Sequence, residues 1–194
     1  MYIPGHFKIT QLDEIQSFIQ SHAFGQLIST VEGKLFSSHI PFLLSEDRTR
    51  LFGHVAKQNP QWRELHGQEA LVTIEGPHGY VSPSWYNTPG VPTWNYQAVH
   101  IYGACSVISD AEKLASLIEK LVEANESGFD SPWRAVYEPN MLSAIVGIEI
   151  KISDFQCKYK LSQNRPREDQ LRVVEALEAS GANQLAQAMR ECSK

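Results

Sequence analysis

The sequence has few of the features that mark membrane, secreted or disulfide-rich proteins. Only three cysteines occur among 194 residues, Cys105, Cys157 and Cys192, and none forms a CxxC pair. This predicts neither a disulfide framework nor a cysteine zinc site. No apolar run reaches the roughly 20 residues that a membrane-spanning helix needs, and the N-terminus lacks the pattern of a signal peptide. We therefore expect a protein of the reducing cytoplasm without membrane association.

An excess of positive charge is also missing. Seventeen Lys and Arg residues face 22 Asp and Glu residues, which gives a formal net charge of −5. Lys and Arg side chains that neutralise phosphates supply most non-specific DNA affinity. The chain therefore lacks the electrostatic footprint of a self-sufficient DNA-binding protein, although a local basic patch is compatible with this total.

Common catalytic and metal-binding signatures are absent as well. The sequence contains no P-loop and no dinucleotide fingerprint, and Ser82 and Ser84 lie outside a G-x-S-x-G nucleophile elbow. None of the three cysteines has a visible activating partner. The seven histidines show no HExxH or similarly tight spacing. We predict no catalytic side chain and no metal site.

The pattern that is present predicts mainly antiparallel β structure with added helices. Strands in hairpin order favour a closed or nearly closed barrel, because closure removes exposed edges. One domain is expected over residues 1–165, with residues 166–194 as its C-terminal helical extension. The predicted strands are Phe24–Val31, Lys34–Phe42, Arg50–Val55, Ala70–Glu75, Gly79–Ser82, Thr93–Ile108 and Gly147–Tyr159.

Helices are predicted between and after these strands. Thr10 starts an amphipathic pattern, Asn59-Pro60 opens a short helix, and Ser109 with Glu112 forms a capping box before a regular apolar face. A short helix is expected around Asn140–Ile145. The tail Arg167–Glu191 is helical with a break at Ser180-Gly181.

A first candidate site lies where the third strand meets the short helix. His54 and Lys57 stand near a helix start, where backbone N–H groups and the helix dipole favour an anion. Charge-assisted hydrogen bonds from both side chains suit a phosphate. The alternative is a plain strand-to-helix connection with solvated side chains.

Three other segments have two interpretations each. The aromatic, proline-rich stretch Tyr80–Trp94 suits ring stacking or a subunit interface, or else a satellite hydrophobic cluster. Lys158–Arg165 is dense in hydrogen-bond donors and could read a polar ligand edge or simply form a solvated exit from the barrel. His39, in Ser37–Phe42, is more typical of a satisfied strand histidine than of a ligand.

Motifs spread over nearly the whole chain resemble the PaiB-type FMN-binding negative transcriptional regulators. Their order and spacing both match, which makes the resemblance specific. The motifs are Met1-Tyr2-Ile3-Pro4 with His6-Phe7, Ser38-His39-Ile40-Pro41, Gly53-His54-Val55-Ala56 with Asn59-Pro60-Gln61-Trp62, Tyr80-Val81-Ser82-Pro83-Ser84-Trp85-Tyr86, Val91-Pro92-Thr93-Trp94-Asn95-Tyr96 and Lys160-Leu161-Ser162-Gln163-Asn164-Arg165.

The resemblance implies a six-stranded antiparallel split β-barrel of the FMN-binding, Greek-key type, related to the pyridoxamine-phosphate-oxidase group. It also implies a homodimer with FMN near the interface. The implied phosphate residues are His54, Val55, Ala56, Lys57 and Asn59. The implied ring residues are Ser38, His39 and Ile40, and the implied residues of the closing partner subunit are Trp85, Trp94, Gln163 and Asn164.

One departure concerns the phosphate. The related oxidases commonly use an Arg/Ser and Lys cluster, whereas this strand ends in Gly53-His54 with Lys57 nearby. We therefore expect weaker phosphate affinity, or binding through backbone donors, and purification can yield flavin-free protein.

Three functions remain open. The first is a flavin-binding repressor, with DNA as a partner through the family resemblance alone. The acidic tail helices are a poor phosphate-facing surface and suit packing or dimerisation better. The second is an FMN-dependent oxidoreductase, in which the cofactor carries the chemistry. The third is a haem-handling split barrel, which requires a histidine ligand to iron.

Overall fold

The structure, a computed structural model, describes residues 1–133 and 139–192 and divides into two compact units. The terminal unit contains Met1–Ile15, Glu75–Val99 and Gln156–Lys194. The barrel unit contains Gln16–Ile74 and His100–Phe155. Strands β6 (Glu69–Val81), β7 (Thr93–Ile108) and β8 (Ile145–Lys160) contribute residues to both units. Each unit is described by itself below.

The first hairpin confirms its prediction from turn chemistry. β2 (Phe24–Val31) and β3 (Lys34–Pro41) pair antiparallel, with Val31 opposite Lys34. Glu32 and Gly33 both have positive φ, 50° and 74°, as a tight turn that matches the strand twist requires. Residues on β2 alternate between buried and half-buried positions, so one face of the hairpin lies on the core.

In the barrel unit, two strands approach each other without forming a hydrogen-bonded ladder. Its sheet runs in the order β3-β2-β6-β7-β8-β5-β4, where β5 is Arg50–Ala56 and β4 is Leu43–Leu44. β5 nevertheless lies against β3, because a Cβ added at Gly53 would meet Ile40 Cδ1 at 3.0 Å and Pro41 O at 3.2 Å. Glycine allows this close approach of two strands that share no ladder. A barrel whose neighbouring strands touch without a ladder at one position is a split barrel.

The number of strands differs from the prediction. The sheet has eight strands rather than six, because two short two-residue strands, β1 (Lys8–Ile9) and β4, escape any periodicity test. The predicted strands Ala70–Glu75 and Gly79–Ser82 are one strand, β6. Its ladder with β2 ends at Ile74, so Pro77 removes no donor from that ladder.

The helix α3 (Ala111–Glu126) confirms the predicted apolar face but not the predicted cap. Asp110, and not Ser109, is the N-cap, and its Oδ1 accepts the Lys113 N–H at 2.9 Å. The buried face packs against half-buried apolar side chains that include Phe52 and Ile108. The buried residues are Leu114, Leu117, Ile118 and Leu121.

We expect Asp110→Ala to lower the free energy of unfolding by about 1 kcal/mol, because it removes the acceptor for a first-turn N–H. Ser109→Ala, a truncation of the neighbouring residue, is the matched control and should leave stability unchanged within about 0.5 kcal/mol. Urea unfolding of the three proteins measures both values. Equal losses in the two variants would contradict the assignment of the cap.

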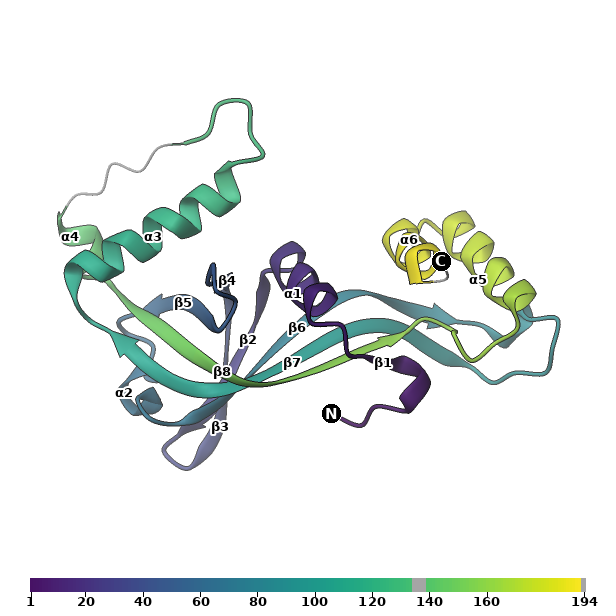
Figure 1. The fold of residues 1–194 in the computed structure, drawn as a ribbon, viewed down its shortest axis with the longest axis horizontal. Coiled ribbons are helices and arrows are strands. Elements are labelled where there is room, and N and C mark those ends of the chain that lie inside the picture. The colour runs from purple at the N-terminus through teal and green to yellow at the C-terminus, as the bar shows by residue number, and fades with distance from the viewer. Residues whose placement is uncertain (134–138, 193–194) are drawn as a thin grey trace. The chain divides into compact units, whose positions relative to one another are not determined.

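Two helices in the terminal unit form an antiparallel pair in the C-terminal segment. α5 (Arg167–Ala179) and α6 (Asn183–Cys192) lie side by side (Figure 1) and break at Gly181, whose φ is 83°. Arg190 makes a two-pronged hydrogen bond to Glu178 across the pair, with both nitrogens at 2.9–3.0 Å. The break at Ser180-Gly181 was predicted.

The remaining helices have ten residues or fewer. Among residues 1–133 and 139–192, no helix combines the length and apolarity needed to cross a membrane. The helices not yet described are η1 (Gly5–Phe7), α1 (Leu12–Ser21), α2 (Trp62–Leu65), η2 (Pro83–Trp85) and α4 (Pro139–Leu142).

Candidate functional site

The end of β5 presents an unsatisfied histidine. Val55 points into the core and is 3% exposed, whereas His54 is half-buried on the opposite face of the strand. Its register partner is Gly147 on β8. Within the described part of the chain, the buried His54 Nδ1 has no hydrogen-bond partner. Because buried polar atoms are normally paired, this nitrogen marks a position where a ligand atom would be favourable.

Burial lowers the pKa of His54 below its ordinary value of 6.5. The folded protein therefore favours the neutral imidazole, while the unfolded chain takes up a proton near pH 6.5. His54 contributes stability above that pH, and the contribution is lost as the pH falls from 6.5 through the lower pKa of the folded state.

We expect the Tm of flavin-free protein to fall more between pH 7.5 and 5.5 than the Tm of His54→Gln. Equal falls would contradict this assignment.

Backbone N–H groups at the β5–α2 junction already donate hydrogen bonds to other parts of the protein. The Lys57 N–H donates to Ala144 O at 2.8 Å, and the Asn59 N–H donates to Ala56 O at 2.9 Å. α2 itself has only four residues. The exposed Lys57 side chain forms no ion pair with any described residue. A phosphate here would therefore depend on the Lys57 and His54 side chains rather than on a nest of N–H groups.

The three predicted ring residues on β3 do not share one face of the strand. Ser38 and Ile40 are 9% and 7% exposed and point inward, whereas His39 is exposed. The His39 ring stacks loosely on Phe24, with ring centres 6.4 Å apart. Asn59 Nδ2 donates to Ser38 Oγ at 2.7 Å, so the structure joins two of the predicted residues directly.

The other four predicted residues lie in the terminal unit. Trp94 is 55% exposed and meets Tyr80 edge to face, with ring centres 6.3 Å apart. Asn164 is exposed, whereas Trp85 and Gln163 are half-buried. Both ends of the Gln163 amide are engaged, since Oε1 accepts the Leu161 N–H at 2.7 Å and Nε2 donates to Tyr159 O at 2.5 Å. Trp94 and Asn164 are therefore the freer surfaces for a ligand or partner.

Gln61 is a polar residue that the sequence analysis did not single out as a site residue. Its side chain is fully buried, and it hydrogen-bonds to β2. Its place directly after Asn59-Pro60 in a family motif was the available signal.

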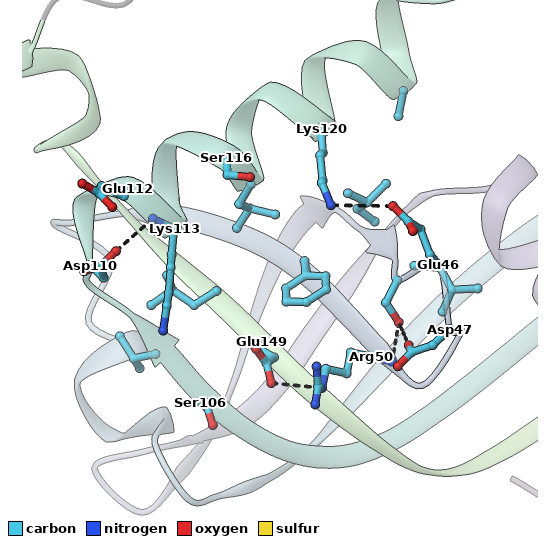
Figure 2. Close-up of a pocket in the computed structure, with 18 of the residues that line it drawn as sticks. Glu46, Asp47, Arg50, Ser106, Asp110, Glu112, Lys113, Ser116, Lys120 and Glu149 are labelled. Atoms are coloured by element: carbon cyan, nitrogen blue, oxygen red, sulfur yellow. Dashed lines mark hydrogen bonds and ion pairs between the residues drawn. The ribbon is translucent and has the colours of Figure 1, made fainter.

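A groove lies elsewhere in the barrel unit. This groove lies between α3 and the sheet (Figure 2) and has a volume of about 1260 Å³. None of the predicted site residues lines it. Arg50 pairs with Glu149 on the sheet at 3.4 Å, and Lys120 pairs with Glu46 across the groove at 3.8 Å. Phe52 adds an apolar surface. No sequence motif joins these residues, so periodicity and spacing could not have found the groove.

Two of the three cysteines, Cys105 and Cys157, are buried. Burial raises the pKa of the Cys105 and Cys157 thiols to about 12, so both are protonated at neutral pH and unsuited to nucleophilic attack. Within residues 1–133 and 139–192, no three His, Cys, Asp or Glu side chains gather as a metal site would require.

The sequence is similar to one characterised bacterial protein over almost its whole length. It is 41% identical to "Protease synthase and sporulation protein PAI 2" of Bacillus subtilis (strain 168), covering 98% of this chain and 97% of that protein. This match confirms the predicted resemblance to the PaiB-type proteins.

Solved structures share the fold, and two of them show the extent of the match. One is the flavocytochrome Anf3 from Azotobacter vinelandii, with a TM-score of 0.67 and 17% identity over 85% of this chain and 75% of that one. The other is the FAD and heme binding protein from Mycobacterium smegmatis, with a TM-score of 0.66 and 17% identity over 84% and 78%. At this identity the two matches show the fold alone. The family model described as "Putative FMN-binding domain" matches residues 1–154, and the chain therefore belongs to this family of split-barrel proteins.

Proposed function

We propose that the chain binds FMN, with the phosphate at the end of β5. The observation that carries this proposal is the buried His54 Nδ1, which has no hydrogen-bond partner among the described residues. The exposed Lys57 side chain follows three residues later and forms no ion pair among those residues. A charged ammonium and an imidazole are suitable donors to a phosphate. The family to which the chain belongs supports the choice of a flavin.

The proposed site uses side chains and backbone differently along its length. His39, His54 and Lys57 would contact the ligand through their side chains. Ile40, Val55 and Ala56 belong to it through backbone atoms, because Ile40 and Val55 point into the core. Ser38 and Asn59 belong to the same predicted set within the barrel unit, but their side chains bond to each other.

We propose a homodimer in which the partner subunit closes this site. The candidates for that contribution are the aromatic and amide side chains of the terminal unit, with the exposed Trp94 as the foremost. Exposed aromatic side chains are enriched at subunit interfaces. The remaining candidates are Trp85, Gln163 and Asn164.

FMN titration with detection of flavin fluorescence and visible absorbance tests the main proposal. We expect saturable quenching at one FMN per chain, and a sizing column should give the mass of two chains. Mass analysis of the supernatant after heat denaturation identifies any flavin that copurifies. Failure of added FMN to bind at micromolar concentration would overturn the proposal.

A regulatory role in the cytoplasm is the biological context that we propose, since the name of the Bacillus subtilis relative refers to sporulation and protease synthesis. The paired helices α5 and α6 carry mixed charge and an internal Arg190–Glu178 ion pair, which gives no basic DNA-facing surface. Salt-sensitive gel-shift binding to genomic fragments is expected if the chain represses directly. Its absence, with intact FMN binding, would limit the protein to flavin binding.

A further inference from the structure

A chain of buried hydrogen bonds ties the segment after β5 to the β2–β3 hairpin. Gln61 begins this chain: its side chain is fully buried, and its Nε2 donates to Leu27 O at 3.0 Å and Ser29 Oγ at 2.9 Å. Both of these acceptors belong to β2, and Phe36 O on β3 accepts a longer bond from Nε2 at 3.4 Å. Gln61 therefore anchors residues 57–61 to a strand that is distant in the sequence.

Asn59 continues the chain to β3. Its Oδ1 accepts the Gln61 N–H at 2.9 Å, and its Nδ2 donates to Ser38 Oγ at 2.7 Å. Ser38 is only 9% exposed. Both ends of the Asn59 amide are thus engaged inside the protein, and this side chain is better placed to fix its neighbours than to bind a ligand itself.

The chain of bonds includes one buried acceptor that stability alone does not explain. Gln61 Oε1 is buried and has no partner among the described residues. Buried polar atoms in native proteins are nearly always paired, and exceptions concentrate at functional sites. A fully apolar side chain at this position would avoid the unpaired acceptor but would also lose the anchor to β2.

Lys57 lies at the outer end of this anchored segment. Its N–H donates to Ala144 O at 2.8 Å, and its carbonyl oxygen accepts the Trp62 Nε1–H at 2.9 Å. Both backbone groups of Lys57 are therefore fixed, while its side chain is exposed. A fixed backbone beneath a flexible lysine reduces the conformational freedom lost when its ammonium engages an anion.

We infer that Ser38, Asn59 and Gln61 are positioning residues that hold Lys57 toward the flavin phosphate and so set the preference of the site for FMN over riboflavin. The inference rests on the proposed function. It changes the role of Ser38 and Asn59 from flavin contacts to supports of the phosphate-binding segment.

The test compares FMN with riboflavin, which has the same ring but no phosphate. Fluorescence titration of Ser38→Ala should show an FMN affinity about tenfold below that of the unaltered protein, the usual scale for one lost supporting hydrogen bond. Asn59→Ala also removes the acceptor of the Gln61 N–H, so its loss of FMN affinity should be at least as large. The riboflavin affinity should stay unchanged. Ser37→Ala is the matched control. Ser37 is the residue before Ser38 on β3, and its truncation removes an exposed hydrogen bond from Ser37 Oγ to Gln26 Oε1 on β2.

The double variant Ser38→Ala/Asn59→Ala tests whether the two residues act through one bond. We expect its FMN affinity to equal that of Asn59→Ala, since the second truncation removes nothing further. Thermal melts of every variant identify any that fail to fold, and the ratio of the two affinities is compared only among folded proteins.

The outcomes separate the two proposals. If the unaltered protein binds no FMN, the proposed function fails and the inference fails with it. If it binds FMN but Asn59→Ala and Ser38→Ala keep the same ratio of FMN to riboflavin affinity, the inference alone is overturned. A parallel loss of both affinities gives the same unchanged ratio and also overturns it, because the residues would then support the whole fold.

Discussion

Gly103→Ala is expected to lower the free energy of unfolding by about 3 kcal/mol, at the upper end for overpacked interiors. A Cβ at this position would lie 2.4 Å from Lys151 O and 2.7 Å from Ile150 Cγ2. Real Cβ atoms do not approach a carbonyl oxygen this closely, so β7 and β8 would have to separate locally. For a chain of this length, we expect the Tm to fall by about 6 to 12 °C.

Gly128→Ala is the matched control for this change. The same barrel unit contains Gly128, and a Cβ added there meets no atom of the described residues within 4 Å. Thermal and urea unfolding should leave Gly128→Ala within about 0.5 kcal/mol of the unaltered protein. A Gly103→Ala protein that unfolds like this control would show that the β7–β8 contact is looser than the structure indicates.

Local patterns were sufficient to predict most long elements. The Glu32-Gly33 turn, the bounds of β7 and the apolar face of α3 follow from turn chemistry and periodicity, because each depends on residues that are close in sequence. The close approach of Gly53 to Ile40 depends on residues of two strands that share no ladder. No local pattern encodes it.

The sequence indicated the types of residue in the candidate site but not the hydrogen bonds that they make. His54 and Lys57 stood out as donors beside a strand end, and both remain the foremost phosphate candidates. The expectation that backbone N–H groups would help was weakened by the hydrogen bond from Lys57 N to Ala144 O. Ala144 is far along the chain and has no distinctive side chain, so this competition for the donor becomes visible only in three dimensions.

Lys57→Ala is expected to reduce FMN affinity by about 10- to 100-fold, the range for one hydrogen bond to a charged group. Riboflavin affinity should change little, because the ammonium is assigned to the phosphate. The dependence of FMN affinity on salt should also weaken, since an exposed charge pair is screened by ions. Flavin fluorescence titrations at low and high ionic strength measure all three quantities.

Lys34→Ala provides the charge-matched control. Lys34 is exposed at the start of β3, beside the Glu32-Gly33 turn and at the opposite end of that strand from Ile40. Removing it changes the net charge by the same amount as Lys57→Ala, so a general electrostatic effect would appear equally in both variants. If Lys34→Ala weakens FMN binding as much as Lys57→Ala, the phosphate is attracted by overall charge and the junction after β5 is not its site. A loss confined to Lys57→Ala, together with a smaller loss in His54→Gln, would assign the phosphate to the two side chains that the structure leaves available there.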